Sequence, residues 1–169
     1  VTLYGDVKNV VASAIVDLNK IADYSILQNF ETTQFWKDLV PPHGSKGQIS
    51  LKQWPQIKND ALKIKENLSQ LEPVQNQQDI EYIIYACDQL IFMADYRIAL
   101  VEIAKLYRAT CLEQSNRSLC RINLGQISHE LTNLISTWEI LSERYQYLWR
   151  LESRSYWLEN VIANFDHII

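Results

Sequence analysis

The stretch that decides the fold is ISHELTNLISTWEILSERYQYL, residues 127 to 148. Its apolar side chains recur at alternating intervals of four and three residues. They are Ile127, Leu131, Leu134, Trp138, Leu141, Tyr145 and Leu148. A mean spacing of about 3.5 residues is typical of a helix packed on another helix in a left-handed bundle. We therefore predict a long helix from about Leu119 toward the end of the chain, with this seam buried against a neighbour.

Three earlier segments carry similar helical spacing. The first is expected from about Asp6, a suitable N-cap, to about Leu27. The second is expected from Trp54, with Pro55 at the first helical position, to Glu72. The third is expected from about Gln77 to Cys111. One apolar stripe is predicted on each of the first two helices: Val7, Val11, Ala14, Leu18 and Ile21 on one, and Ile57, Ala61, Ile64, Leu68 and Leu71 on the other.

The third helix carries apolar residues around much of its circumference. Its main stripe is Ile80, Ile84, Cys87, Ile91, Ala94, Ile98 and Val101, and a second stripe is Ile83, Leu90 and Met93. We expect this helix to be contacted on two sides. The chain has only four Gly and four Pro, so long stretches lack the residues that interrupt helices. The sequence predicts an all-α fold, an elongated antiparallel bundle of about four to five helices with short connections, forming one domain over residues 1–169.

Composition excludes several classes of function. The net charge of −4 argues against a nucleic-acid surface, which needs clustered Lys and Arg. No apolar run is long enough to span a membrane. The chain begins with Val rather than Met, and we expect it to be a piece of a longer protein.

The motifs of common catalytic sites are absent from the sequence. His43, His129 and His167 lie far apart, and none begins a helical metal-binding motif. The chain has no cysteine pair with zinc-site spacing, no Gly-rich phosphate loop and no Gly-x-Ser-x-Gly motif. We expect no active site, metal or cofactor within this chain.

The cysteines and tryptophans each allow two interpretations. Cys111 and Cys120 flank the polar turn between the last two helices, where they could form a disulfide or remain two reduced thiols. Exposed tryptophans could stack on sugars, and the alternative is that they fill the bundle core or the crevices at its ends. The tryptophans considered are Trp36, Trp54, Trp149 and Trp157.

The seam of the last helix breaks after Leu148. Its continuation falls on Glu152, Ser155 and Glu159, where the core pattern requires apolar residues. An apolar set reappears around the helix as Leu151, Leu158, Ile162, Phe165 and Ile169. The helix therefore either leaves the bundle axis or meets a polar surface here. We name the residues at this break the C-terminal corner and interpret them as interface candidates: Trp149, Glu152, Arg154, Tyr156 and Trp157.

The stretch LWRLESRSYWLEN, residues 148–160, with the VIANFD that follows it, resembles the end of bacterial glycoside hydrolase family 20 proteins, the β-N-acetylhexosaminidases. The residues that match that family's pattern are Leu148, Trp149, Glu152, Arg154, Trp157, Leu158, Phe165 and Asp166. Ser153 stands where the family usually has Asn, which puts a side-chain amide role at that position in doubt.

The resemblance implies a non-catalytic helical domain that follows a separate catalytic barrel and packs on it or contributes to a homodimer. The barrel of that family carries a His-x-Gly-Gly-Asp/Glu-Glu type motif, which does not occur in this chain. Two alternatives remain. One is a stand-alone helical module that binds a partner protein. The other is a sugar-binding module that uses the tryptophans.

Overall fold

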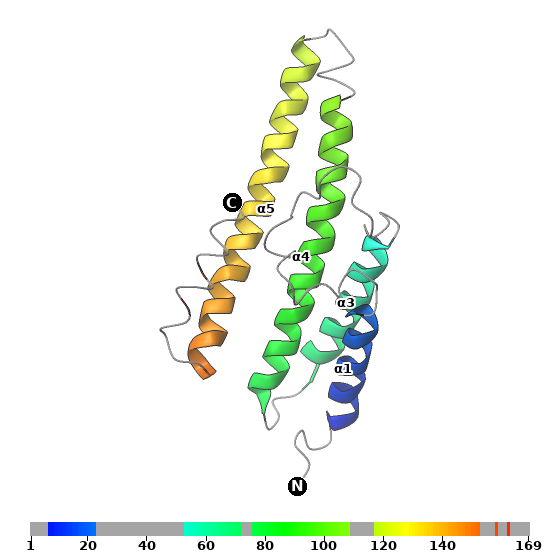
Figure 1. The fold of residues 1–169 in the computed structure, drawn as a ribbon, viewed down its shortest axis with the longest axis vertical. Coiled ribbons are helices and arrows are strands. Elements are labelled where there is room, and N and C mark those ends of the chain that lie inside the picture. Colours follow the sequence, from blue (N-terminus) through cyan, green and yellow to red (C-terminus); the bar gives the residue numbers. More distant parts are fainter. Residues whose placement is uncertain are drawn as a thin grey trace.

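The computed structural model describes residues 7–22, 53–71, 76–108 and 117–152, together with the single residues 158 and 162. Within these ranges the chain is helical and contains no strand, which confirms the predicted all-α fold. The helices are α1 (Lys8–Ala22), α3 (Trp54–Ser69), α4 (Gln77–Tyr107) and α5 (Arg117–Glu152). They form an elongated bundle in which successive long helices run antiparallel (Figure 1).

The described ends of the helices lie near the predicted positions, and residues at each end explain why the helix begins or stops there. Pro55 lies in the first turn of α3, where a missing N–H costs no helical hydrogen bond. At the other end of α3, the backbone N–H of Gln70 donates to the carbonyl of Glu66, and that of Leu71 donates to the carbonyl of Leu68. Asn76, with φ of 63°, precedes α4 in the left-handed conformation that Asn tolerates better than most residues. The predicted N-cap Asp6 lies outside the described residues.

The first hydrophobic core joins α1, α3 and α4. Its buried members are Val11, Ala14, Ile21, Trp54, Ile57, Ala61, Ile64, Leu68, Ile80, Cys87 and Ala94. These include most of the stripes predicted on the first three helices. Ile83, Leu90 and Met93 pack against this same core. This core contains side chains of both α1 and α3, so these three residues lie on the side of α4 that faces that pair of helices.

A second, separate core joins α4 to α5. Its buried members are Tyr85, Phe92, Trp138, Leu141 and Leu148, with Tyr82, Tyr96, Leu134 and Tyr145 packed around them. The ring centroids of Phe92 and Trp138 lie 5.2 Å apart. The third predicted helix is thus contacted on two sides, as expected, but its second contact surface is aromatic. Helix α4 stands between α5 on one side and the pair α1 and α3 on the other (Figure 1).

The helices differ greatly in length, and this leaves one end of the bundle uncovered. Helix α3 has 16 residues, whereas α4 has 31 and α5 has 36. At 1.5 Å per residue, α4 is about 20 Å longer than α3. The end of α4 and the beginning of α5 therefore project beyond α1 and α3 as a two-helix hairpin (Figure 1). We call this part the projecting end.

Candidate functional site

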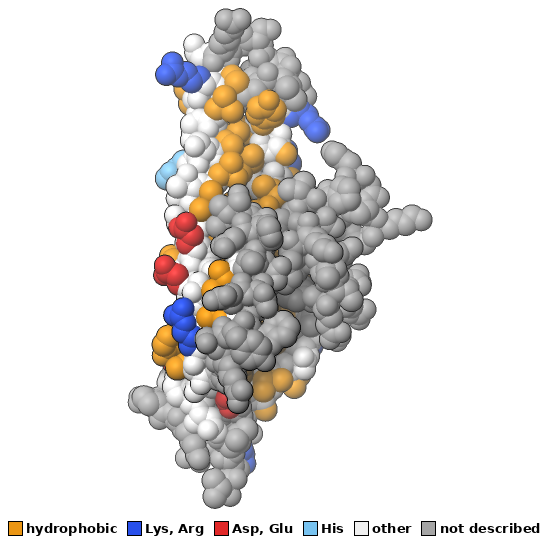
Figure 2. All heavy atoms as spheres, turned by 60° about the vertical axis from the view of Figure 1, so that its left-hand side comes forward, with side chains coloured by type: hydrophobic (Ala, Val, Ile, Leu, Met, Phe, Trp, Pro, Cys, Tyr) orange, Lys and Arg blue, Asp and Glu red, His pale blue; other side chains and the backbone are white. Residues whose placement is uncertain are grey.

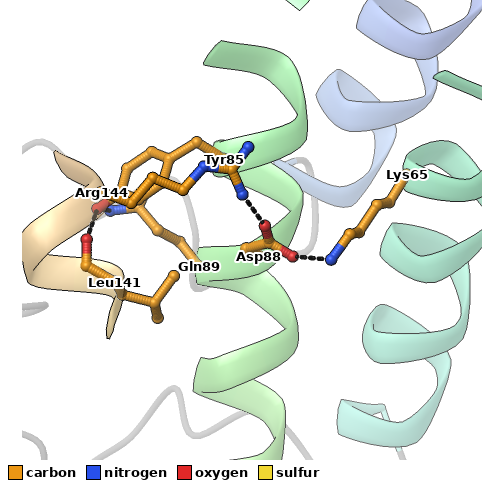
Figure 3. A network of polar contacts seen from close by, with 6 residues as sticks. All are labelled: Lys65, Tyr85, Asp88, Gln89, Leu141 and Arg144. Carbon is orange, nitrogen blue, oxygen red and sulfur yellow. Dashed lines mark hydrogen bonds and ion pairs between the residues drawn. The ribbon is translucent and has the colours of Figure 1, made fainter. Parts of the chain in front are cut away.

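The carboxylate of Asp88, on α4, pairs with cations from two other helices. Its Oδ1 accepts a hydrogen bond from Lys65 Nζ of α3 at 2.6 Å, and its Oδ2 accepts one from Arg144 Nη1 of α5, also at 2.6 Å. The side chain of Asp88 is only 16% exposed. Figure 3 shows Asp88 between the two cations, with each partner on a different helix. One carboxylate therefore links all three of these helices.

Two tyrosines of α4 donate hydrogen bonds to backbone carbonyls of α5. Tyr85 Oη donates to the carbonyl of Leu141 at 3.2 Å, and Tyr82 Oη donates to the carbonyl of Leu148 at 2.9 Å. Gln89 Nε2 lies 3.3 Å from Tyr85 Oη and donates to it (Figure 3). These contacts fix the position of α5 along α4 without any charged group. Burial raises the pKa of Tyr85, and repulsion from Tyr145 adds to this, so its hydroxyl stays protonated and can donate.

The arrangement around Asp88 suits a structural role better than acid–base chemistry. Both carboxylate oxygens accept bonds from cations at 2.6 Å, which leaves neither oxygen directed at a substrate. No cluster of three or more His, Cys, Asp or Glu that could hold a metal ion occurs among the described residues. Every buried side-chain N or O atom in the same ranges has a hydrogen-bond partner. The described helices thus present no unpartnered buried polar group aimed at a ligand.

The C-terminal corner is only partly described. Trp149 is half-buried, and its ring lies 5.7 Å from the ring of Tyr145. Glu152 is the last residue of α5. Arg154, Tyr156 and Trp157 lie outside the described residues, so their role as interface residues stays a prediction. Beyond α5, Leu158 is buried with 4% exposure.

The predicted seam of α5 is buried only along its second half. Trp138, Leu141 and Leu148 are buried against α4, as predicted. Leu131, in the first half, is 38% exposed. The prediction of a seam buried along its whole length is therefore wrong. The physical reason is that the second core joins α4 to α5 only from Leu134 onward among the described residues, so Leu131 lies beyond the end of this core.

Besides Leu119 and Ile122 near its beginning, α5 carries two groups of exposed apolar side chains. The first, which we call the open seam, lies toward the projecting end and consists of Leu124, Leu131 and Ile135, with exposures of 45%, 38% and 40%. The second, which we call the outer stripe, consists of Ile140, Tyr147 and Leu151, with exposures of 64%, 56% and 47%. Figure 2 shows apolar side chains gathered along the upper part of the molecule, over the projecting end. Exposed apolar groups of this kind are typical of interaction surfaces.

The tryptophans within the described residues are not free sugar platforms. Trp54 is buried with 6% exposure in the first core, which confirms the core-filling interpretation for this residue. The ring of Trp149 lies tilted beside the ring of Tyr145, and Trp149 is half-buried. Trp36 and Trp157 lie outside the described residues, so the sugar-binding prediction remains untested for them.

The cysteines differ in their environment. Cys87 is free and buried in the first core, and burial raises the pKa of its thiol to about 12. Cys120, in the first turn of α5, is disulfide-bonded, which favours the bridge over two reduced thiols. Cys111 lies outside the described residues, so its pairing with Cys120 stays a prediction.

Comparisons with known proteins add no identification. The chain matches no protein-family model, no curated protein and no solved structure. Among the described helices, none is both long and apolar enough to cross a membrane.

Proposed function

We propose that this chain is a non-catalytic accessory domain of a β-N-acetylhexosaminidase, in which a separate barrel domain hydrolyses terminal N-acetylhexosamine residues. The proposal takes its enzyme class from the resemblance of residues 148–166 to the end of family 20 proteins. It takes its non-catalytic character from the engagement of Asp88 by two cations and from the motifs missing in the sequence. The role of the chain would be interdomain docking.

The observation that carries the docking role is the outer stripe. Ile140 lies two residues beyond the buried Trp138, about 200° around the helix at 100° per residue, and so on the side away from α4. Tyr147 and Leu151 follow on that side at helical spacing. Complete burial of such a side chain contributes about 1.5–3 kcal/mol, and roughly half of that is still available here because the residues are 47–64% exposed. The stripe also leads directly into the C-terminal corner.

Two measurements test this proposal. The purified chain should show no turnover of a chromogenic N-acetyl-β-glucosaminide, because the residues that would act on the sugar belong to the barrel. The reading frame upstream of the codon for Val1 should continue into a barrel domain with the His-x-Gly-Gly-Asp/Glu-Glu type motif. A start codon immediately before Val1, with no barrel in the frame, would refute the accessory-domain proposal.

The docking surface is tested in the protein that contains both domains. Leu151→Asp places a charge in the outer stripe and should speed proteolytic cleavage between the domains, since the docked surface would then bury a carboxylate. Lys63→Asp is the control, because Lys63 is exposed on α3, away from the stripe. Equal cleavage rates in the two variants would show that the outer stripe is not the docking surface.

The second candidate function is a stand-alone module that binds a helix of another protein through the same outer stripe. The exposed apolar residues of α5 support it as well as they support docking on a barrel. The upstream reading frame separates the two candidates. A complete reading frame that starts at this chain would favour the stand-alone module.

A further inference from the structure

The open seam lies on a different part of α5 from the outer stripe. Its binding partner is therefore considered separately from the barrel domain. Leu124 and Leu131 are seven residues apart, and Ile135 follows four residues later, so the three lie along one side of the helix. Leu124 and Leu131 also continue the heptad spacing of the buried seam upward into the projecting end. Helix α4 is the described helix beside this part of α5, and it leaves the open seam partly exposed.

Two exposed charges of opposite sign lie beside the open seam. Arg121 and Glu139 are eighteen residues apart, which equals five helical turns, so both lie on the same side of α5. At 1.5 Å per residue they are about 27 Å apart, too far to pair within one chain. Neither has an ion-pair or hydrogen-bond partner among the described residues. Their midpoint is residue 130, next to Leu131.

We infer that the projecting ends of two copies of this chain pack together, with the two α5 helices antiparallel and Leu131 of each copy near a twofold axis. In that register Arg121 of one copy lies opposite Glu139 of the other, and symmetry repeats the pair at the far end. Leu124 of one copy then lies close to Ile135 of its partner, so the apolar residues of the open seam cover one another. The two hairpins would form a four-helix arrangement.

The self-complementary pattern is what favours a second copy over an unrelated protein. An isologous interface requires that each charged position meet its opposite across the axis, and the order Arg121, Leu131, Glu139 meets this requirement about a single centre. An unrelated partner would impose no such symmetry on one helix. The inference does not depend on the hexosaminidase proposal, because it uses only residues of α5 between Arg121 and Glu139.

The register also limits how far the two α5 helices overlap. With the centre at residue 130, the first residue of α5 in one copy lies opposite residue 143 of the other, so residues beyond 143 have no partner on the second α5. Arg150 is exposed and lies on the same side of the helix as Arg121, but outside this overlap. Arg150→Glu changes the net charge by the same amount as Arg121→Glu, which makes it a matched control.

The experiment measures the mass of the full chain by sedimentation equilibrium across a range of micromolar concentrations. The unchanged chain should approach twice the mass of one 19.8 kDa chain. Arg121→Glu places like charges opposite one another at both ends of the interface and should raise the dimer dissociation constant about tenfold or more. Arg121→Glu combined with Glu139→Arg restores opposite charges and should recover most of the lost affinity. Arg150→Glu should leave the dissociation constant unchanged.

Three results would overturn the inference. The first is a monomer mass at every concentration, including the case in which the monomer binds another protein through the same residues. The second is equal weakening by Arg121→Glu and Arg150→Glu, which would indicate a general charge effect. The third is no recovery in the doubly substituted chain. Circular dichroism of each variant should remain helical, since all three positions are exposed on the surface of α5.

Discussion

Removing the charge of Asp88 should destabilise the fold more than removing any exposed ion pair. Asp88→Asn keeps the size of the side chain but removes the negative charge that holds Lys65 and Arg144. Two cations on separate helices would then face each other without the carboxylate between them. The substitution therefore weakens the link between α3, α4 and α5 at a single point.

The expected loss of unfolding free energy in Asp88→Asn follows from how deeply Asp88, Lys65 and Arg144 are buried. Asp88 is 16% exposed, while Lys65 and Arg144 are 38% and 33% exposed. Exposed ion pairs contribute about 0.2–1 kcal/mol, and breaking a fully buried pair costs about 3–5 kcal/mol. The two pairs of Asp88 lie between these limits, so we expect a loss of about 2–3 kcal/mol in the free energy of unfolding.

Urea unfolding followed by circular dichroism measures this loss. A double-mutant cycle then shows how much of it comes from the interaction between Asp88 and Arg144. Asp88→Asn and Arg144→Gln, alone and together, should give a coupling energy of about 1 kcal/mol. Asp17→Asn is the control, because Asp17 pairs with Lys20 at a similar distance of 2.7 Å on an exposed face, and its unfolding midpoint should not change. If Asp88→Asn unfolded at the same urea concentration as the unchanged chain, the structural role of Asp88 would be wrong.

Three further predictions concern other parts of the molecule. Gly125→Ala should stabilise the fold by about 0.5–1 kcal/mol, because Gly125 lies inside α5 and an added Cβ meets nothing within 4 Å; a lower melting temperature would contradict this. Trp138→Ala should cost about 3–5 kcal/mol of unfolding free energy, whereas Ile140→Ala, two residues away and 64% exposed, should cost far less. Finally, stability should fall as the pH rises above about 9, because the unfolded chain loses the protons of Cys87 and Tyr85 before the folded chain does. For Cys87 this loss develops between its ordinary pKa of 9.0 and its raised pKa of about 12, and Cys87→Ala should show a shallower decline of the urea midpoint over that range.

The helices were predictable because apolar spacing is a local property of the sequence. The stripes of the first three helices were identified residue by residue, and nearly all of them lie in the first core. The beginning of α3 at Trp54 and of α4 at Gln77 agree with the predicted positions. Pro55 marks the first of these starts directly.

The second face of α4 escaped the sequence analysis because it is aromatic. Tyr82, Tyr85 and Tyr96 carry polar hydroxyls, so an apolar pattern does not include them. The hydroxyls of Tyr82 and Tyr85 find their acceptors in backbone carbonyls of α5, which the sequence pattern does not reveal. Aromatic residues at helical spacing on α4 were a signal that could have revealed this face.

The Asp88 network and the open seam depend on relations between helices, which no single helix encodes. Lys65, Asp88 and Arg144 meet only because the relative rotation and offset of α3, α4 and α5 bring them together. The open seam arises because the described members of the second core on α5 begin at Leu134, which leaves Leu124 and Leu131 partly exposed. The heptad spacing predicted burial for Leu131. It could not indicate that the neighbouring helix leaves this side chain 38% exposed.

The most direct test of the proposed function is the rate at which the purified chain hydrolyses a chromogenic N-acetyl-β-glucosaminide. We predict a rate equal to the buffer background, because the partly buried carboxylate of Asp88 is held between Lys65 and Arg144 and the residues that would act on the sugar belong to the barrel. The result that would contradict the proposal is saturable turnover that substitution of a single carboxylate, such as Asp88→Asn, abolishes while the chain remains folded.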